Sequence, residues 1–375
     1  MGLKPVPGPL DEYPIHQAPL PIDRVASSDR NFYDRCYFNV HDGAGEVFLV
    51  TGLGVYPNLG VIDAYATARC GDRQWTVQFS DALAERSLDQ QVGGYRIDVL
   101  EPLRQLRLRC QAPDGGIEFD LRWTSAFPAV QEEPHLLLAG RRPILDASRF
   151  SQVGSWDGQL RVGDREFEVT AGRWAGARDR SWGIRPAGEP EPAGRSASEP
   201  LEGFWWLYAP LRFESCAVIV ILQEEPDGHR TLNDAKRIGR DGRVEQLGWP
   251  RAEITYRPGT RHPESARLHL TDPAGTPLTV ELETVMSVPL HVGAGYGGDP
   301  DWTHGQWMGP DWARSAVYDL TDPAVAGRIP FGVTDHLARA RLGDEPGWGL
   351  FEHASMGRHD PTGFADWSSV ASRPI

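Results

Sequence analysis

The sequence lacks several features that would assign it quickly to a known class of protein. No run approaches the roughly 18 apolar residues that a membrane helix needs, and the N-terminus lacks the basic-then-apolar pattern of a signal peptide. Cysteine is scarce: the chain has 4, widely spaced and without a CxxC pair, so neither a disulfide framework nor a structural zinc site is expected. A reducing cytoplasm is the simplest expected location.

The motifs of nucleotide-dependent enzymes and of α/β-hydrolases are absent as well. The chain has no GxxxxGK[ST], no GxGxxG after a predicted strand and no GxSxG nucleophile elbow. Ser181 stands between Arg180 and Trp182, without the glycines that a strained nucleophile turn needs. Chemistry that depends on a nucleotide or on a hydrolase-type serine is therefore not expected.

Basic residues are too few to balance the acidic ones. Lys and Arg number 38 against 52 Asp and Glu, so the formal net charge of the 375-residue chain is −14. This charge argues against non-specific binding to nucleic acid or to anionic membranes, because both are negatively charged. We expect no nucleic-acid partner and no membrane insertion.

What the sequence does contain is a repeated strand–turn–strand pattern. Apolar and charged residues alternate over 106–110 and over 117–123, on the two sides of a turn at 113–116. The same pattern flanks Gly163-Asp164, and residues 217–222 form an apolar run that is typical of a fully buried strand. A period of two on both sides of a turn predicts antiparallel hairpins with one wetted face.

Helical patterns are nearly missing. The only helix that we expect is a short one around 322–326. Residues 46–51 and 61–69 read as further strands, and 267–282 as another hairpin. Because no βαβ alternation is present, the sequence predicts an all-β protein with two barrels or sandwiches.

The chain divides into four parts. Residues 1–30 are rich in proline and predict an extended N-terminal arm, and residues 31–185 predict a first β-barrel. Residues 186–200 have no periodicity and almost no large side chain, which indicates a linker. Residues 201–375 predict a second barrel with a C-terminal extension.

The most distinctive segment runs from Arg178 to Arg185, at the end of the first predicted barrel. It holds three guanidinium groups, the Asp179 carboxylate, a hydroxyl and the Trp182 indole in eight residues. Arg178 beside Asp179 would orient the carboxylate by charge-assisted hydrogen bonds and lower its pKa. The alternative is an Arg–Asp pair that only ties one barrel strand to its neighbour.

Polar and aromatic residues gather again near the C-terminus. His304, His336 and His353 with one carboxylate would suit zinc or iron, but none has HxH or HExxH spacing. Such histidines are more often hydrogen-bonded in a core or serve as acid–base groups, so no metal is expected. Asp335 and Glu352 lie beside two of these histidines in sequence and are further candidate acids.

Four segments resemble a known family. The motif Gly-x-Arg-Asp-x-Ser-Trp-Gly-x-Arg at 176–185 is similar to the signature of uncharacterised bacterial proteins related to AttH and carotenoid 1,2-hydratase. Residues 301–307, 317–323 and 347–353 are similar to the same group. The resemblance implies two lipocalin-like antiparallel β-barrels in tandem. It also implies relatives that act on hydrophobic, often isoprenoid or polycyclic molecules without an organic cofactor.

Together, the residues and the resemblance predict a cofactor-independent lyase, hydratase or isomerase that acts on an isoprenoid, steroid-like or aromatic small molecule by acid–base catalysis. Asp179 could be the acid only if burial raises its pKa, whereas its flanking arginines would lower it. The competing hypotheses are a non-catalytic carrier of a hydrophobic ligand and a charged motif that only joins the barrels. The oligomeric state stays open, a homodimer included.

The expected site draws on both halves of the chain, because Asp179 has no histidine near it in sequence. The predicted catalytic residues are Asp179, His304, His336 and His353. The predicted substrate-binding residues are Arg178, Trp182, Arg185, Trp205, Trp206, Tyr208, Trp302 and Trp307. We expect a pocket lined by indoles, with at least one of these imidazoles on its wall.

Overall fold

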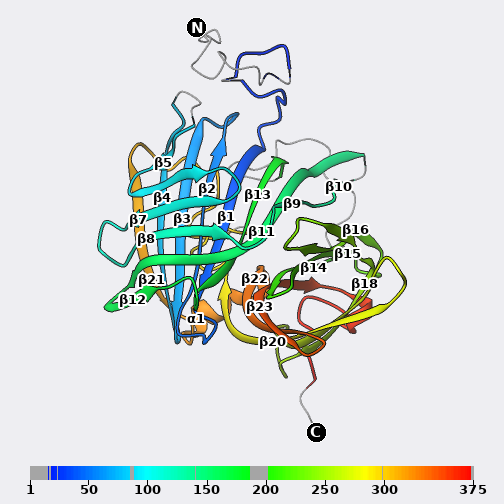
Figure 1. Ribbon diagram of the computed structural model, residues 1–375. Coiled ribbons are helices and arrows are strands. Elements are labelled where there is room, and N and C mark those ends of the chain that lie inside the picture. The colour runs from blue at the N-terminus through cyan, green and yellow to red at the C-terminus, as the bar shows by residue number, and fades with distance from the viewer. Residues whose placement is uncertain are drawn as a thin grey trace.

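The computed structural model describes residues 16, 18–22, 24–84, 88–139, 141–185, 202–297 and 299–372. Of the described residues 61% lie in strands and 3% in helices, which confirms the all-β prediction. The predicted linker at 186–200 and most of the N-terminal arm lie outside the described residues. The strands form two antiparallel sheets that lie against each other (Figure 1).

The first sheet has 14 strands in the order β21-β4-β3-β2-β1-β13-β11-β8-β7-β6-β5, and β9, β10 and β12 pair with the long strand β11. Its strands are β1 (Phe32–His41), β2 (Phe48–Tyr56), β3 (Val61–Cys70), β4 (Arg73–Ala82), β5 (Gln90–Val92), β6 (Tyr95–Glu101), β7 (Gln105–Gln111), β8 (Ile117–Ser125), β9 (Val130–Gln131), β10 (His135–Ala139), β11 (Arg142–Val162), β12 (Arg165–Val169), β13 (Ala175–Ile184) and β21 (Trp312–Asp319).

The second sheet has nine strands in the order β17-β16-β15-β14-β23-β22-β20-β19-β18. Its strands are β14 (Gly203–Phe213), β15 (Cys216–Glu224), β16 (Arg230–Gly239), β17 (Val244–Gln246), β18 (Gly248–Tyr256), β19 (Pro263–Thr271), β20 (Pro277–Pro289), β22 (Thr334–Leu342) and β23 (Glu345–Gly357). The short helices are α1 (Pro323–Ala326), η2 (Ile329–Phe331) and η3 (Asp360–Thr362).

Several local predictions are confirmed. The turn at 113–116 joins β7 to β8, and Gly163-Asp164 joins β11 to β12. The apolar run 217–222 lies within β15, every residue of which is buried. The short helix expected near 322–326 is α1, whose first turn is capped by the Asp322 side chain.

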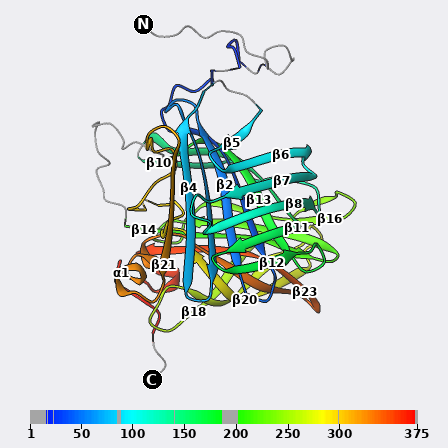
Figure 2. The ribbon, with the colours of Figure 1, turned by 90° about the vertical axis from the view of Figure 1, so that its left-hand side faces the viewer.

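One sheet is a half-barrel and the other a nearly closed barrel, as the lipocalin-like prediction required. In the half-barrel, β5 to β8, β11 and β12 cross over the long strands β2 to β4 (Figure 2). In the second sheet the two terminal strands of the order, β17 and β18, follow each other in sequence, and this connection brings the sheet edges together.

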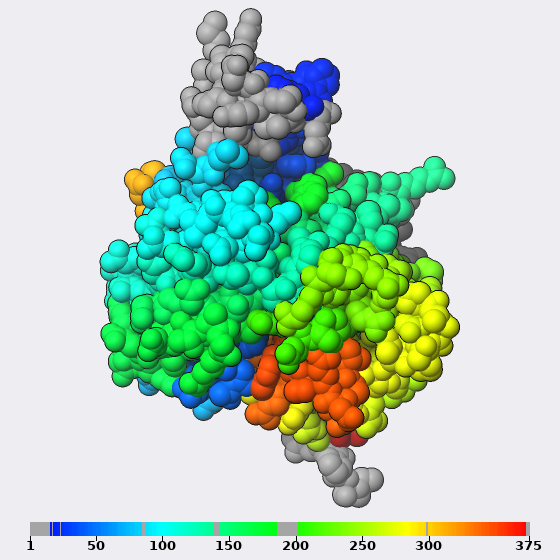
Figure 3. Space-filling model, in the orientation of Figure 1, coloured from blue at the N-terminus to red at the C-terminus, as the bar shows by residue number. Residues whose placement is uncertain are grey.

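The apolar core has three main parts. Phe38, Trp123 and Trp156 belong to the core of the first sheet, and Val220 and Phe351 to that of the second. A third part joins the sheets and takes residues from both, including Phe48, Tyr65, Leu337 and Leu350. In Figure 3 the cyan and green surface of the first half directly contacts the yellow-green and orange surface of the second.

One strand departs from the predicted division of the chain. Residues 201–375 were expected to form the second barrel, yet β21 pairs with β4 at the edge of the first sheet, from Trp312 opposite Ser80 to Asp319 opposite Arg73. Covering this edge satisfies backbone groups of β4 that would otherwise be unpaired. The first sheet is therefore completed by the second half of the chain.

Two further features of the fold concern its helices and its cysteines. None of the described helices has the length and apolar character needed to cross a membrane. All four cysteines are buried, and none forms a disulfide.

Candidate active site

β13 carries the distinctive segment Arg178–Arg185 through the middle of the first sheet, between β1 and β11. Gly183 has φ +137°, and a Cβ atom there would lie 2.1 Å from the Asp146 carbonyl oxygen. At Gly176 a Cβ atom would lie 2.0 Å from the Asn39 carbonyl oxygen. The two glycines of the motif are therefore needed because neighbouring backbones approach too closely for any side chain.

The predicted Arg178–Asp179 pair is not formed. Successive residues of a strand point to opposite faces of a sheet, so these two side chains diverge. Arg178 donates from Nε to Gln152 Oε1 at 2.8 Å on one face, and burial lowers its pKa to about 10. Asp179 faces the other way, toward the second sheet. Residues that are neighbours in the sequence of a strand are therefore not neighbours on one face of the sheet.

Asp179 lines a cavity of about 160 Å³ between the two sheets. Its walls come from β1, β10, β11 and β13 of the first sheet and from β14, β15, β16 and β23 of the second. Leu137, Ile221 and Leu232 make part of the wall apolar. The charged and aromatic lining residues include Tyr33, Arg35, Tyr37, Glu132, His135, Arg149, Asp179, Arg185, Trp206, Tyr296 and Glu352.

The Asp179 carboxyl group is buried and has no hydrogen-bond partner in the part of the chain that the structure describes. Its exposed fraction is 9%, and no donor among the described residues lies within hydrogen-bond distance of its oxygens. Burial raises its pKa to about 7; the positive charge of Arg149 opposes this shift, whereas Glu132 and Glu352 add to it. Near neutral pH both its protonated and ionised forms are present, which suits a general acid or base.

A second acidic group faces the cavity from β23. Glu352 lies opposite Asp335 of β22, and Trp206 donates from Nε1 to Glu352 Oε1 at 2.5 Å. Behind it, the Tyr37 hydroxyl donates to Asp335 Oδ2 at 2.5 Å. Burial and then the charge of Glu352 raise the pKa of Asp335 well above its usual range, and burial also raises the pKa of Glu352. Both carboxyl groups of the pair are therefore harder to ionise than free ones, and their titrations depend on each other.

Arg149 of β11 is held in place by an acid and two aromatic rings. Its Nε donates to Glu132 Oε2 at 2.6 Å, and its guanidinium lies 4.3 Å from the centre of the Tyr208 ring and 5.7 Å from that of Trp206. Ser151 contacts both Glu132 and the Tyr208 hydroxyl. Tyr208, a predicted binding residue, therefore supports Arg149 from behind the cavity wall.

The imidazole in the cavity wall is one that the sequence interpretation missed. His135 of β10 stacks on Trp206, with ring centres 5.7 Å apart. Burial, aided by the charge of Arg149, lowers its pKa to about 4, so it is neutral at pH 7. Its Nε2 is buried and has no hydrogen-bond partner among the described residues.

The three histidines predicted to be catalytic do not line the cavity. His304 packs among the rings of Tyr65, Tyr296 and Trp302. In the other two, Nδ1 binds a backbone carbonyl: that of Phe351 for His336 and that of Trp206 for His353. Burial lowers the pKa of all three, that of His353 to about 3, so all three are neutral at pH 7.

The predicted aromatic wall is only partly present. Of the five tryptophans proposed to bind substrate, Trp206 lines the cavity and the adjacent Trp205 points into the core of the second sheet. Trp302 is buried in the core between the sheets, Trp307 is half exposed, and Trp182 lies outside the lining. Tyrosines supply much of the remaining aromatic surface. Arg185 does line the cavity, as predicted.

The cavity residues of β1, which the sequence interpretation did not name, do show a recognisable pattern in the sequence. Tyr33, Arg35 and Tyr37 alternate with Asp34 and Cys36, which places one polar–aromatic set on a single face. Glu132, His135 and Arg149 carry no comparable signal, because only long-range strand pairing brings them to the cavity.

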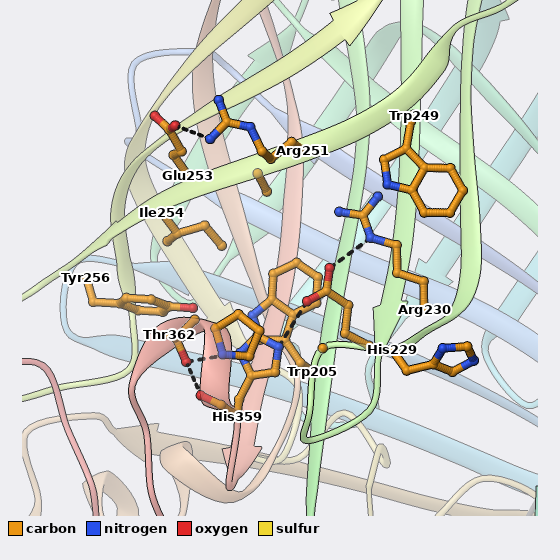
Figure 4. A pocket seen from close by; sticks show the side chains of 14 residues that line it. Trp205, His229, Arg230, Trp249, Arg251, Glu253, Ile254, Tyr256, His359 and Thr362 are labelled. Atoms are coloured by element: carbon orange, nitrogen blue, oxygen red, sulfur yellow. Dashed lines mark hydrogen bonds and ion pairs between the residues drawn. The ribbon is translucent and has the colours of Figure 1, made fainter.

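A larger pocket of about 820 Å³ lies on the second sheet (Figure 4). There Glu224 binds Arg230 Nε at 2.9 Å and His359 Nε2 at 3.1 Å. Although burial opposes the shift, the hydrogen bonds from His359 and Arg230 lower the pKa of Glu224. This acid is ionised and already paired near neutral pH, whereas Asp179 is not. We therefore place the candidate active site in the cavity between the sheets.

The chemistry available in that cavity is proton transfer. Asp179 can give and take a proton near pH 7, the Asp335–Glu352 pair adds two carboxyl groups with raised pKa values, and the guanidinium groups can hold developing negative charge. Among the described residues, no group of three or more His, Cys, Asp or Glu side chains is close enough together to hold a metal ion.

The two sheets and the cavity between them define a protein with the AttH-like lipocalin fold. A protein described as an AttH from Nitrosomonas europaea superposes with a TM-score of 0.54 at 14% identity, covering 91% of this chain and 98% of its own. Kievitone hydratase from Nectria haematococca gives 0.51 at 11% identity, covering 86% and 89%. CghA with Sch210972 gives 0.50 at 12% identity, covering 88% and 89%. The resemblance stated from the motifs is confirmed for the fold.

The chain belongs to a family of unknown function, DUF8625, whose sequence profile matches residues 8–365. No curated protein matches the chain significantly in sequence.

Proposed function

We propose that this protein is a cofactor-independent enzyme of the hydratase (lyase) or isomerase class that moves a proton on a hydrophobic small molecule. The observation that carries the proposal is Asp179: a buried carboxyl group with a pKa of about 7 and no hydrogen-bond partner among the described residues, in the wall of a partly apolar cavity. A carboxyl group kept in this state is costly for folding and useful for acid–base catalysis.

The size of the cavity limits the part of the substrate that it can enclose. Its volume is about 160 Å³. Because a cavity of about 150 Å³ is known to hold a benzene molecule, the space accepts one ring or the reacting end of a longer molecule. Leu137, Ile221 and Trp206 offer apolar contacts to such a group.

The two acidic centres suit two different roles. Asp179 on β13 delivers a proton to the substrate, and the Asp335–Glu352 pair on the opposite sheet accepts one from water or from another carbon. In a hydratase the net result is the addition of H and OH across a double bond. In an isomerase one proton is added to one carbon, another proton is removed from a different carbon, and water takes no part.

The solved structures of similar fold support the class, but their substrates are not carried over to this chain. Kievitone hydratase is a hydratase by name and shares the fold, but at 11% identity it carries no residue roles to this chain. The expected partners remain a hydrophobic small molecule and no nucleic acid. The expected location remains the cytoplasm, with which four cysteines that form no disulfide are consistent.

The test compares Asp179→Asn with the wild type on single-ring alkenes and enones, such as limonene and cyclohexenone, in D2O. Mass spectrometry measures water addition and deuterium incorporation. We expect turnover to fall about 100-fold or more in the variant, because an amide cannot exchange the proton. Asp34→Asn is the matched control, since Asp34 lies on the opposite face and binds Arg180 at 2.9 Å.

Two outcomes would count against the proposal. Equal turnover in Asp179→Asn and the wild type would remove Asp179 from the chemistry. Tight binding of the same compounds with no conversion would favour the non-catalytic carrier.

A further inference from the structure

Arg35 is a buried cation whose guanidinium finds no hydrogen-bond acceptor among the described residues. It lies on β1 with an exposed fraction of 7%, lines the cavity, and no described residue accepts a hydrogen bond from its side chain. The guanidinium does make a cation–π contact with the face of the Tyr296 ring, whose centre is 4.9 Å away. Burying a charge without a partner is costly, so such a group normally has a ligand.

Other arginines of the first sheet show what a satisfied guanidinium looks like in this fold. Arg149 binds Glu132, Arg178 binds Gln152, and Arg180 binds Asp34. Asp63 is the carboxyl group whose charge acts on Arg35, and its oxygens already accept hydrogen bonds from other groups. Asp63 Oδ2 accepts from the backbone of Gly305 at 2.6 Å, and the Tyr56 hydroxyl donates to Oδ1 at 3.4 Å.

Arg35 also lies close to the proposed acid. In the pairing of β1 with β13, Arg35 is opposite Ser181 and Tyr37 is opposite Asp179. Arg35 and Asp179 are therefore diagonal neighbours on the same face of the sheet, and both face the cavity. One bound molecule can reach both groups.

We propose that Arg35 binds an oxygen of the substrate that carries or develops negative charge, so that the substrate is a hydrophobic molecule with a carboxylate or a carbonyl conjugated to the reacting double bond. This inference rests on the proposed function and adds the substrate class to it. A guanidinium is well suited to this role because it presents several donors to one acceptor group.

The corresponding hydration step balances without a cofactor. The oxygen of water adds to the β carbon, and the double-bond electrons move onto the carbonyl oxygen, where Arg35 holds the enolate. Asp179 gives its proton to the α carbon as the enolate returns to the carbonyl. Glu352 takes the proton that the water loses, and exchange with solvent returns Asp179 and Glu352 to their starting states.

The charges in the cavity favour this route over direct protonation of an isolated alkene. That alternative forms a carbocation, and Arg35, Arg149 and Arg185 all line the space in which it would develop. Among the described residues, Arg149 alone of these three has a carboxylate partner, which is Glu132. The repulsion from unpaired guanidinium groups would raise the energy of a carbocation and lower that of an enolate.

The test uses three ligands of one ring size: benzoate, neutral benzamide and cationic benzylammonium. Isothermal titration with the full-length wild type should give benzoate the highest affinity and benzylammonium the lowest. In Arg35→Met we expect benzoate affinity to fall about tenfold or more, since a charge-assisted hydrogen bond is lost, and benzamide affinity to fall less, because its neutral carbonyl oxygen is a weaker acceptor. Arg35→Lys keeps the charge and should retain part of the preference.

Arg180→Met is the matched control, because it removes one positive charge from the neighbouring strand on the opposite face. It should leave the order of the three ligands unchanged. Benzamide binding and circular dichroism show whether each variant retains the folded cavity.

The inference is overturned if benzylammonium binds at least as tightly as benzoate, or if folded Arg35→Met and Arg35→Lys both bind benzoate like the wild type. Its failure is distinct from that of the proposed function. If the inference is wrong, benzoate binding does not depend on Arg35. If the proposed function is wrong, turnover does not depend on Asp179.

Discussion

At the scale of single residues, the properties of Asp179 come from its neighbours in space and not from those in sequence. Arg178 and Arg180 flank it in the chain but point to the opposite face, where they bind Gln152 and Asp34. Burial therefore dominates, and the pKa of Asp179 rises to about 7 instead of falling. The two flanking arginines therefore do not prevent Asp179 from having the raised pKa that a catalytic acid needs.

This pKa shift has a measurable cost. The folded protein holds a proton on Asp179 between its ordinary pKa of 3.8 and about 7, so this group makes stability fall as the pH rises through that window. Each pKa unit corresponds to about 1.4 kcal/mol, which gives a loss of at most about 4 kcal/mol above pH 7. Asp179→Asn should therefore be more stable than the wild type at about pH 8 in urea unfolding, and the difference should vanish near pH 4.

Glu132, Glu352, Arg149 and Arg35 also act on Asp179, but all of them remain in the variant, so the difference isolates Asp179. Asp34→Asn should give no stabilisation at either pH, because its carboxylate is paired with a guanidinium. A variant Asp179→Asn that is less stable than the wild type at about pH 8 would show that the carboxylate is compensated in the folded state.

At the scale of the strand, alternation explains what the sequence could and could not predict. The hairpin of β7 and β8 was predictable because Leu106, Leu108 and Cys110 alternate with charged residues before the turn. The same rule, applied to β13, would have separated Arg178 from Asp179. The sequence could not show that the three predicted catalytic histidines lie outside the lining of this cavity, because a histidine beside an acidic residue looks the same in sequence whether its ring is buried in a core or lines a cavity.

Alternation makes a prediction about Arg178 that is the reverse of the one for Asp179. Arg178→Met removes the buried hydrogen bond to Gln152 and leaves Gln152 Oε1 without a donor, which should lower the free energy of unfolding by about 1 to 3 kcal/mol. Benzoate binding and turnover should not change, because the side chain does not reach the cavity. Chemical denaturation and titration of the same sample measure both effects.

The pair of variants is informative together. Asp179→Asn should lose chemistry and keep or gain stability, whereas Arg178→Met should lose stability and keep chemistry. A loss of benzoate affinity in folded Arg178→Met would place its guanidinium on the cavity face, against the register of β11 and β13.

At the scale of the whole molecule, the two sheets depend on each other. The second half of the chain supplies β21 to the first sheet, and the core between the sheets takes Phe48 and Tyr65 from one half and Leu337 and Leu350 from the other. The strand content and the two-sheet architecture could be predicted from local patterns. The pairing of β21 with β4 could not, because these strands are separated by most of the chain and only the folded structure brings them together.

This shared core predicts that the sheets unfold together. Leu337→Ala removes a fully buried side chain from the core between the sheets and should cost about 2 to 5 kcal/mol. Leu268→Ala makes the same change inside the second sheet. If the molecule is one cooperative unit, differential scanning calorimetry shows a single transition, with equal calorimetric and van't Hoff enthalpies, that both variants shift to lower temperature. If Leu268→Ala instead moves one of two transitions and leaves the other in place, the sheets are independent domains. The cavity would then lie at an interface that could open without unfolding, and the rigid placement of Glu352 opposite Arg35 and Asp179 of the first sheet would lose its basis.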